Sequence, residues 1–361
     1  MKILYVITGL SGGGAEKVVA ALADQMHLRG HQVKIAYLKG RDVVVKPECN
    51  SIQLIYFGFE KINDFVFASK KYRALILSFK PDIVHAHMVH ANIFVRLNRI
   101  VCNVPKIICT AHNANEGGKL RMAAYRITDS LSDINTNVSV EAVEAFIQKK
   151  AFKDTAIAVY NGIDLNKFKN IELSQPKLNY DDTRNHIKKI LAVGRLNIQK
   201  DYPNLLNALL IIKKEKKSDF KLFIVGDGEE RKNILSLIQK LSLEDNVELL
   251  GRRDDIPELM SEADVFVLSS AFEGFGLVVA EAMACETFVV ATDCGGVKEV
   301  MGNTGLLVPP KDSTALAQAL TTAMEMSNAD IKINNQQGLE YVKHNFDLQL
   351  IIKKWLNLYE K

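Results

Sequence analysis

The chain of 361 residues lacks any run of about 18 apolar residues, so its sequence predicts no membrane-spanning helix. Its first stretch, 1–7, is apolar for only the length of a strand, which is too short for a signal peptide. Cysteine is scarce, with five residues and no C-x-x-C pair. An odd count at this spacing argues against a disulfide framework or a zinc site, and we expect a reducing cytoplasm.

An excess of charge of one sign is also lacking, because 46 Lys and Arg residues stand against 42 Asp and Glu residues, for a formal net charge of +4. The balance differs between the halves. Residues 1–168 hold 22 basic and 14 acidic side chains, a charge of +8, and residues 169–361 hold 24 and 28, a charge of −4. A basic half attracts anionic partners or membrane headgroups, although scattered solvated lysines give the same count.

Short apolar stretches of strand type alternate with helical patterns in both halves. Continuous apolar strands separated by helices are typical of a parallel sheet covered on both faces. The expected strands are 3–8, 32–38, 52–56, 82–85 and 106–110 in the first half, and 190–193, 221–225, 247–250, 265–268, 288–291 and 305–308 in the second. The sequence therefore predicts an α/β protein of two doubly wound, Rossmann-like domains that face each other across a cleft.

A polar stretch from 166 to 186, with Pro176 and Asp181-Asp182, is the expected linker. We place the first domain at 1–168 and the second at 186–340. The tail at about 346–361 has the spacing of an amphipathic helix. Its expected apolar members are Ile351, Trp355, Leu356 and Tyr359.

One loop of the second half combines two kinds of binding group. A strand-type run at 263–268 leads into a glycine loop with Glu273 and then a helix start with Glu281. The backbone N–H groups that would point out of this helix N-terminus, where phosphate binds readily, belong to Phe275, Gly276 and Leu277. Phosphate donors beside acceptors for sugar hydroxyls suit a nucleotide sugar. Solvated helix-start charges are the simpler alternative.

Two cations follow the first strand of the second half. Arg195 and Lys200 are five residues apart at a strand end, so both could reach one diphosphate, Arg through a bidentate fork and Lys as a point charge. They would then stabilise the leaving-group charge that a divalent ion stabilises elsewhere. Solvated loop cations are the alternative. No metal site is expected.

Glycines mark three further strand ends. The stretch 226–228, Gly226-Asp227-Gly228, is a turn that needs a permissive backbone, and Glu229 beside it is a further candidate contact. Gly251 and Arg252 close the next strand, where a base could lie against the backbone. The loop with Gly13 and Gly14 opens the first helix and could bind an anion. This loop matches the NAD-binding pattern poorly, because the second strand has no acidic residue at its end.

Histidines cluster at strand ends of the first half. His85 and His87 share a strand face, but zinc needs three or four ligands, so we expect side chains that line a cleft. His112 also ends a strand and could donate to a sugar hydroxyl. A structural role remains the default for each lone histidine.

Together these segments resemble the retaining family-4 glycosyltransferases of the GT-B fold, particularly those that build bacterial O-antigen and capsule repeat units. The resemblance covers nearly the whole chain. Its most specific part is the pair Glu273 and Glu281, which have seven residues between them, Gly274-Phe275-Gly276 among these. The other matching segments, in chain order, are 12–16, His112, 161–164, Gly194-Arg195 with Lys200, and 226–228.

The resemblance implies a role for each matched residue. Arg195 and Lys200 would hold the donor diphosphate, and the Gly12–Gly14 loop would close on the phosphates. Glu281 would hold the nucleotide ribose. Glu273, with the amides of 275–277, would bind the donor sugar, and His112 would touch that sugar or the acceptor. The stretch 116–122 is no general motif of the family, so Lys119 and Arg121, with His85 and His87, are only candidate acceptor contacts.

The resemblance also implies the reaction. Such enzymes move a sugar from a UDP- or GDP-linked donor to a saccharide, retain the anomeric configuration and need neither metal nor cofactor. A glycoside hydrolase with Glu273 and Glu281 as acid and nucleophile is a rival, but it leaves Arg195 and Lys200 unexplained. A sugar-nucleotide epimerase and a non-catalytic sugar-nucleotide-binding protein are further rivals. Their products or lack of turnover would distinguish them.

The acceptor implied by the resemblance sits on undecaprenyl pyrophosphate, which would bring the protein to the cytoplasmic face of the inner membrane. The basic first half could supply the attraction, and no nucleic-acid partner is expected. The candidate side chains are Lys70, Lys71, Arg73, Arg96, Arg99, Lys119, Arg121 and Arg126, interleaved with Phe65, Phe67, Phe94, Met122 and Tyr125. A solvated helix face explains the same charges.

Overall fold

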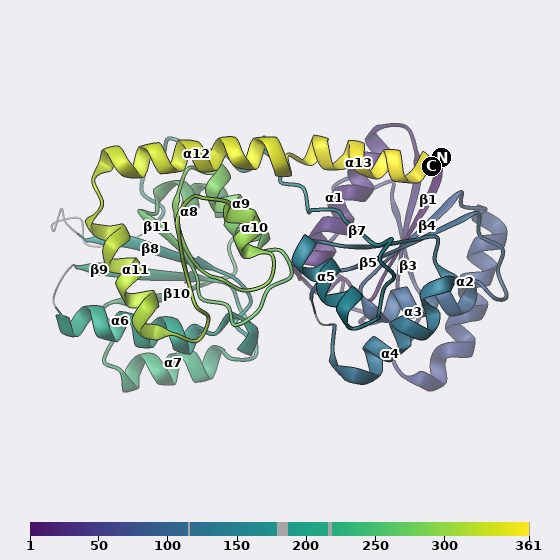
Figure 1. The fold of residues 1–361 in the computed structure, drawn as a ribbon, viewed down its shortest axis with the longest axis horizontal. Coiled ribbons are helices and arrows are strands. Elements are labelled where there is room, and N and C mark those ends of the chain that lie inside the picture. Colours follow the sequence, from purple (N-terminus) through teal and green to yellow (C-terminus); the bar gives the residue numbers. More distant parts are fainter. Residues whose placement is uncertain (115, 179–186, 216–218, 361) are drawn as a thin grey trace. The chain divides into compact units, whose positions relative to one another are not determined.

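The computed structural model describes residues 1–114, 116–178, 187–215 and 219–360. The chain forms two compact units (Figure 1). One comprises residues 1–162 and 349–361, and the other comprises residues 163–348. The chain thus leaves the first unit at Gly162 and returns to it at Gln349. Residues 179–186, the end of the expected linker, lie outside the described residues.

The first unit is built on a seven-stranded parallel sheet with the order β3-β2-β1-β4-β5-β6-β7. Its strands are β1 (Lys2–Ile7), β2 (Gln32–Tyr37), β3 (Gln53–Tyr56), β4 (Ile83–His87), β5 (Lys106–Ala111), β6 (Ile134–Asn137) and β7 (Ile157–Ala158). Its helices are α1 (Gly14–Leu28), η1 (Ile62–Asp64), α2 (Phe65–Phe79), α3 (Val89–Asn98), α4 (Gly118–Thr128), η2 (Asp129–Leu131) and α5 (Val140–Gln148).

The second unit is built on a six-stranded parallel sheet with the order β10-β9-β8-β11-β12-β13. Its strands are β8 (Lys188–Val193), β9 (Phe220–Val225), β10 (Val247–Gly251), β11 (Val265–Leu268), β12 (Phe288–Thr292) and β13 (Leu306–Val308). Its helices are η3 (Ile198–Lys200), α6 (Tyr202–Glu215), α7 (Arg231–Lys240), α8 (Ile256–Glu262), α9 (Leu277–Ala284), α10 (Val297–Met301), α11 (Ser313–Glu325) and α12 (Asn328–Phe346).

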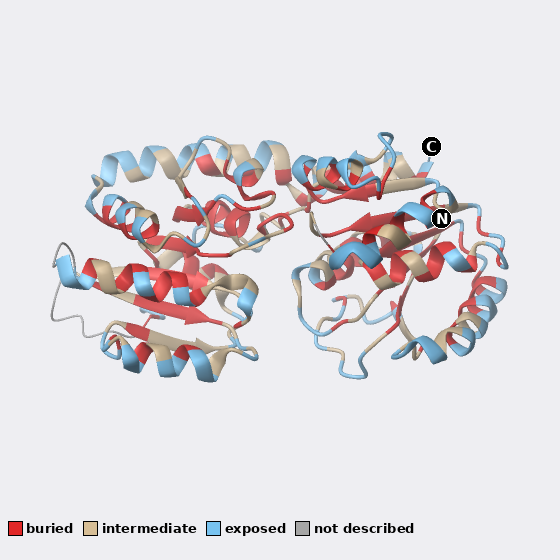
Figure 2. Cartoon of the chain, turned by 60° about the horizontal axis from the view of Figure 1, so that its bottom comes forward, coloured by how far each residue is buried: buried red, intermediate tan, exposed pale blue. Residues whose placement is uncertain are grey.

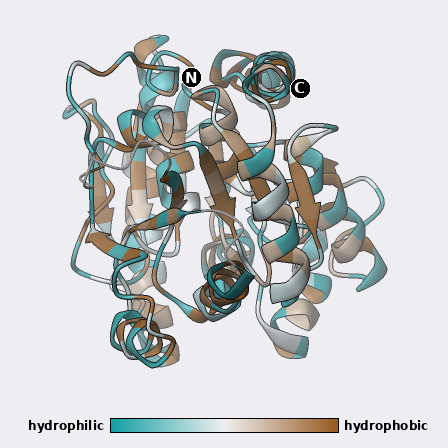
Figure 3. Cartoon of the chain, turned by 90° about the vertical axis from the view of Figure 1, so that its left-hand side faces the viewer, coloured by the Kyte–Doolittle hydropathy of each residue, from teal (hydrophilic) through white to brown (hydrophobic). Residues whose placement is uncertain are grey.

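The prediction of two doubly wound domains is confirmed, since each unit is a doubly wound parallel sheet. Apolar strands explain the packing: β1 and β11 are buried almost throughout (Figure 2). The strands are also among the most apolar segments in Figure 3. The sequence missed β6 and β7, because β6 is polar and β7 has only two residues.

The last helix, α13 (Leu348–Glu360), packs on the first unit. Its predicted apolar members Ile351, Trp355 and Tyr359 are buried, and Leu356 is half-buried. The Tyr359 hydroxyl lies 3.0 Å from that of Tyr5 on β1. The amphipathic pattern of the tail therefore reflects burial against this sheet.

Strand order also fixes where loops converge. In the first unit the order reverses between β1 and β4, and in the second between β8 and β11. In doubly wound sheets ligands bind at the carboxyl ends of the strands beside such a reversal. The loops that leave these strands contain most of the residues singled out from the sequence.

Candidate functional site

The loops after β8 and β11 bring two predicted residues together in the second unit. Lys200, at the end of η3, places its Nζ 2.6 Å from Oε1 of Glu273. Ser270 Oγ donates to the same oxygen at 2.7 Å. The Lys200 and Glu273 side chains are only 15% and 11% exposed, so their attraction is weakly screened by solvent. Lys200 still has donor capacity for an anion, because an ammonium carries three N–H groups.

Several residues that sequence reasoning did not assign hold these two loops together. Ser269 Oγ donates to the Lys200 carbonyl at 2.8 Å, and the Ala271 N–H donates to the Gln199 carbonyl at 2.9 Å. Thr292, at the end of β12, donates its hydroxyl to the Ser270 carbonyl at 2.6 Å. Serine and threonine at strand ends were the available signal. The position of Glu273 is thus fixed by hydrogen bonds from two neighbouring strands.

Gly295 is a second residue that the sequence analysis missed. It has a φ of +56°, and a Cβ there would lie 1.9 Å from the Glu273 carbonyl oxygen. No side chain can be accommodated at that distance without moving backbone. The adjacent glycines Gly295 and Gly296 were the signal in the sequence. Close approach of these two loops therefore requires glycine at 295.

The turn after β9 is equally constrained. Gly226 has a φ of +139°, and a Cβ there would lie 1.9 Å from the Gly194 carbonyl oxygen. The Gly226 N–H donates to the Gly251 carbonyl at 2.8 Å, which joins the ends of β9 and β10. Arg252, next to Gly251, is exposed. Three strand ends are therefore joined beside Gly194 and Arg195.

Arg195 lies on the exposed side of this turn. Its Nη2 is 3.3 Å from Glu229 Oε2, and the two side chains are 60% and 56% exposed. A surface pair of this kind contributes little to stability. The guanidinium could therefore exchange Glu229 for an anionic ligand at small cost.

Helix α9 starts directly after the Glu273 loop. Gly276 is its N-cap, with a φ of +87°, and Leu277 is its first residue. The Phe275 side chain is buried and meets Phe346 edge-on, with ring centroids 5.3 Å apart. Phe275 therefore has a packing role, and only its backbone could face a ligand. Glu281, on the second turn, is 8% exposed, which is unusual for a carboxylate.

In the first unit, two predicted histidines are in contact at the ends of β4 and β5. His87 Nδ1 lies 3.0 Å from His112 Nε2, and both side chains are buried. Burial lowers the pKa of His112 to about 4, and burial with the neighbouring histidines lowers that of His87 well below 6.5. Both rings are therefore neutral at pH 7, so His112 can bind a hydroxyl but holds no ready positive charge.

The expectation that His87 lines a cleft is wrong, because its side chain is fully buried. The same expectation for His85 is also wrong. Its side chain is fully buried, with Nδ1 2.8 Å from the Tyr359 hydroxyl and Nε2 2.7 Å from Thr110 Oγ1. Both ring nitrogens are thus used inside the first unit. Residue 85 lies two residues before the strand end, which places it within the sheet. Its role in the structure is to help dock α13.

Glu116 is a functional candidate that was not assigned from the sequence. Its Oε1 accepts the His112 N–H at 2.7 Å, and its Oε2 accepts the Tyr125 hydroxyl. Asn92 Nδ2 donates to that hydroxyl at 2.8 Å. Burial raises the pKa of Glu116 to about 7, although these hydrogen bonds oppose the shift. A carboxyl group that changes charge near neutral pH therefore fixes the backbone of His112.

The remaining predicted residues of the first unit lie at helix starts. Gly13 is the N-cap of α1 and Gly14 its first residue, at the end of the loop that follows β1. Lys119 and Arg121 are exposed in the first turn of α4, and Arg121 Nη1 donates to the Glu116 carbonyl at 3.2 Å. These positions are compatible with ligand contact.

Some candidate membrane contacts are corrected by the structure. Arg96 is fully buried and donates to the Tyr125 carbonyl at 3.2 Å. Phe94, Met122 and Tyr125 are buried as well. Arg99 forms an ion pair of 2.7 Å with Asp133. The four buried side chains were misjudged because helix sequence alone does not say which face meets the sheet.

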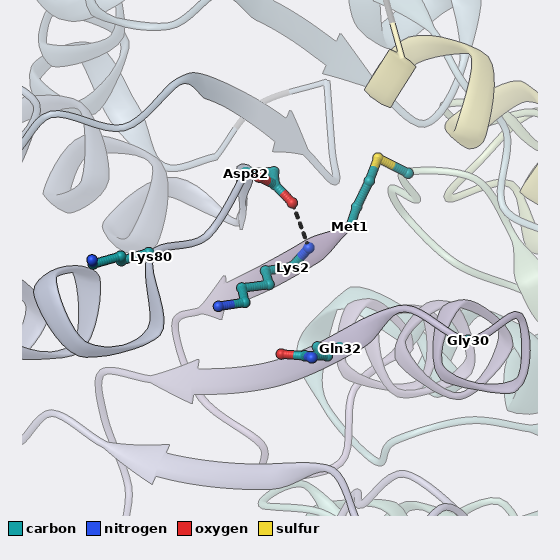
Figure 4. A pocket seen from close by; sticks show the side chains of 6 residues that line it. All are labelled: Met1, Lys2, Gly30, Gln32, Lys80 and Asp82. Atoms are coloured by element: carbon teal, nitrogen blue, oxygen red, sulfur yellow. Dashed lines mark hydrogen bonds between the residues drawn. The ribbon is translucent and has the colours of Figure 1, made fainter.

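A pocket of the first unit lies away from all of these residues (Figure 4). Figure 4 shows Lys2 and Asp82 in it, where the Lys2 N–H donates to the Asp82 carboxylate at 2.7 Å. Its other lining residues are Met1, Gly30, Gln32 and Lys80. Lys2 and Gln32 begin β1 and β2, so this pocket is at the amino-terminal edge of the sheet. That is the edge opposite the one where such folds bind ligands.

Two doubly wound units, with a paired cation and carboxylate at the strand reversal of one, define a GT-B protein. The chain belongs to the glycosyltransferases: residues 12–167 match the family described as Glycosyltransferase Family 4, and residues 177–338 match Glycosyl transferases group 1.

Similar proteins agree with this assignment. N-acetyl-alpha-D-glucosaminyl L-malate synthase of Bacillus anthracis is 28% identical, over 97% of this chain and 94% of the relative. N-acetylgalactosamine-N,N'-diacetylbacillosaminyl-diphospho-undecaprenol 4-alpha-N-acetylgalactosaminyltransferase of Campylobacter jejuni is 28% identical, over 90% of each chain. The amylovoran biosynthesis glycosyltransferase AmsD of Erwinia amylovora is 24% identical, over 98% of each.

Solved structures show the same fold. Sucrose-phosphate synthase from Thermosynechococcus elongatus has a TM-score of 0.88 at 22% identity, covering 100% of this chain and 98% of that one. Anabaena Alr3699/HepE in complex with UDP-glucose has a TM-score of 0.82 at 22% identity, covering 100% and 99%.

Proposed function

We propose that this glycosyltransferase moves a sugar from a nucleoside diphosphate sugar to a saccharide acceptor in the assembly of a bacterial surface polysaccharide. The observation that carries the proposal is the Lys200–Glu273 pair beside the start of α9. A cation, a carboxylate and a helix N-terminus match the diphosphate and the hydroxyl groups of such a donor.

Each group has a proposed role. Lys200 and Arg195 bind the diphosphate, together with the first-turn N–H groups of α9. Glu273 accepts a hydrogen bond from a hydroxyl of the donor sugar, while Lys200 keeps its carboxylate in place. Glu281 accepts from the ribose hydroxyls, and the strand ends at Gly226, Gly251 and Arg252 lie along the base. Gly13 and Gly14 add N–H groups from the start of α1.

The charge that develops on the leaving diphosphate is proposed to be stabilised by Lys200 and Arg195, without a metal ion or other cofactor. Transfer would retain the anomeric configuration, with the leaving phosphate taking the proton of the acceptor hydroxyl. His112, which is neutral at pH 7, would hold a sugar or acceptor hydroxyl by a hydrogen bond.

The acceptor is proposed to be a lipid-linked saccharide, with the enzyme at the cytoplasmic face of a membrane. Two Campylobacter relatives are named for transfer to undecaprenol-linked saccharides, and residues 1–168 carry a charge of +8. No helix in the described parts of the chain is long and apolar enough to cross a bilayer, so approach would be peripheral. Lys119 and Arg121 are the nearest cations to His112 in the sequence that could meet acceptor phosphate.

The relative named N-acetyl-alpha-D-glucosaminyl L-malate synthase supports a second candidate, transfer of the sugar to a small hydroxy acid. Cations on α4 would bind its carboxylates as well as phosphate.

Incubation of the purified protein with UDP- and GDP-sugars, and with either an undecaprenyl-pyrophosphate-linked saccharide or malate, tests the proposal. The expected result is release of the nucleoside diphosphate and an NMR spectrum in which the new linkage keeps the anomeric configuration of the donor, with EDTA present. Loss of activity with EDTA and recovery with Mg²⁺ would refute the metal-free step. Conversion of the donor to its epimer without acceptor, or binding without turnover, would favour the rival functions.

A further inference from the structure

The exposed face of η1 and α2 in the first unit carries an unusual group of large apolar side chains. Ile62, Val66, Phe67 and Leu77 are 78%, 64%, 59% and 64% exposed. Four such side chains within 16 residues are more than the scattered apolar surface of ordinary proteins. Large exposed apolar side chains grouped on one amphipathic helix are a feature of surfaces that meet a partner or a membrane.

The helix is nevertheless firmly packed by its other face. Its buried residues are Ala68, Tyr72, Leu75, Ile76 and Phe79. Tyr72 meets Phe94 of α3 edge-on, with ring centroids 5.7 Å apart. The outward apolar residues are therefore additional to those that the core requires.

Cations lie between these apolar side chains. Val66, Lys70, Arg73 and Leu77 follow at steps of four, three and four residues, which places them on one stripe of the helix. Lys70 and Arg73 are exposed, and α2 contains no Asp or Glu. Lys71 Nζ lies 4.7 Å from the centre of the Phe67 ring.

The nearest acidic side chain in sequence lies before α2 and is bonded to backbone. The Asp64 carboxylate, just before α2, accepts the backbone N–H groups of Glu60 and Lys61 at 3.1 and 2.8 Å. From Lys61 to Lys80 the chain has five basic residues and one acidic residue. The stripe therefore combines exposed apolar side chains with an excess of positive charge.

Exposed apolar residues continue at the end of α3, which packs on α2. Ile100 and Val101 are 71% and 59% exposed. Cys102, which follows them, is buried and belongs to the same apolar cluster as Tyr72, Leu75 and Ile76 of α2. Together Ile62, Val66, Phe67, Lys70, Arg73 and Leu77 are termed the α2 surface, and Ile100 and Val101 extend it.

We propose that the α2 surface docks on an anionic lipid bilayer. Apolar side chains on a helix that lies flat insert at the acyl boundary, while flanking Lys and Arg meet the anionic headgroups. A second copy of this chain would bring the same cations face to face, so charge complementarity favours the bilayer. The inference deepens the proposed function, because a lipid-linked acceptor requires a membrane-bound enzyme, but its test measures binding alone.

Co-sedimentation with vesicles tests the proposal. We expect the protein to bind vesicles with about 30% phosphatidylglycerol, to bind pure phosphatidylcholine far less, and to be released as added salt shortens the screening length to about 3 Å at 1 M. The double variant Phe67→Glu/Lys70→Glu should bind at least about tenfold more weakly, since it loses a surface cation and since carboxylates are repelled by anionic headgroups.

The matched control is Ile333→Glu/Lys332→Glu on α12, in the second unit. Ile333 is 55% exposed, close to the 59% of Phe67, and Lys332 is exposed, so the charge change and apolar loss are equivalent. This control should bind vesicles as the unaltered chain does. Equal loss in both double variants, equal binding to neutral vesicles, or no vesicle binding at low salt would each overturn the proposal.

Donor turnover measured in the same preparations, with a water-soluble acceptor, separates this outcome from the proposed function. Both double variants should keep it. A chain that turns over donor but fails to bind vesicles would retain the proposed chemistry and lose the α2 surface as a docking site.

Discussion

The candidate residues of the two units differ in charge and in burial. In the second unit Lys200 and Glu273 form an ion pair that is partly open to solvent. In the first unit His87, His112 and Glu116 are buried, and burial shifts the pKa values of the two histidines down and that of Glu116 up. The candidate residues of the second unit thus form a charged pair, whereas burial in the first unit favours the neutral forms of the histidines and of Glu116. Charged groups suit the diphosphate of a donor, and neutral hydrogen-bonding groups suit hydroxyls.

The largest effect should come from removing the positive charge of Lys200 in the second unit. Lys200→Met leaves Glu273 without its cation and should cost about 2–5 kcal/mol of transition-state stabilisation. This loss lowers kcat/KM by about 30- to 5,000-fold. Lys189→Met is a matched control, because Lys189 Nζ lies 2.9 Å from Glu262 and their side chains are 16% and 7% exposed. That control should lose stability but keep activity per folded molecule. Equal loss of activity in both variants would make the Lys200 pair merely structural.

The backbone that holds Glu273 offers the next test. Gly295→Ala forces a Cβ to within 1.9 Å of the Glu273 carbonyl oxygen and should destabilise the second unit by about 3 kcal/mol or more in urea unfolding. Gly251→Ala is its control. Gly251 has a φ of +69° with nothing near its Cβ position, so only the backbone strain of about 1 kcal/mol should appear. Similar losses in the two variants would show that close approach at 295 is unimportant.

The buried Glu116 carboxyl group of the first unit should make the stability of the protein depend on pH. The folded-state pKa of Glu116 is raised from 4.5 to about 7, so the folded protein binds a proton that the unfolded chain releases in this range. Stability from this residue therefore falls as pH rises from about 4.5 to 7, by up to about 3 kcal/mol.

Glu116→Gln should remove that fall, and urea unfolding at pH 5 and pH 8 checks it. The lowered pKa of His112 acts in the opposite direction between about 4 and 6.5, so the comparison must be between the variant and the unaltered chain. Parallel stability curves for the two would show that Glu116 stays charged throughout.

Much of the fold and part of the site could be predicted from the sequence. Apolar runs such as Val265–Leu268 mark central strands, and glycines with charges at their ends mark the loops. The Glu273 and Lys200 loops were found separately, but their contact depends on the strand order, which places β8 beside β11. Ser270 contacts Glu273 through one hydroxyl, and Gly295 is needed because a Cβ there would meet the Glu273 carbonyl oxygen. No sequence periodicity predicts such single-atom contacts. His85 and Arg96 were misplaced because polar residues within buried elements resemble exposed ones in sequence.

The smallest expected effect concerns the contact between α13 and the first unit. The Tyr359 hydroxyl lies 3.0 Å from that of Tyr5 and 2.8 Å from His85 Nδ1, and all three side chains are buried. Tyr359→Phe removes the shared partner and should cost about 1–2 kcal/mol, because two buried polar groups lose a hydrogen bond. Tyr341→Phe in the second unit removes one bond, to the Glu299 carbonyl at 2.9 Å, and should cost less. Thermal unfolding and protease resistance of the C-terminal helix measure the difference. If the two variants are equally stable, the buried polar contacts of the first unit contribute no more to stability than a single tyrosine bond in the second.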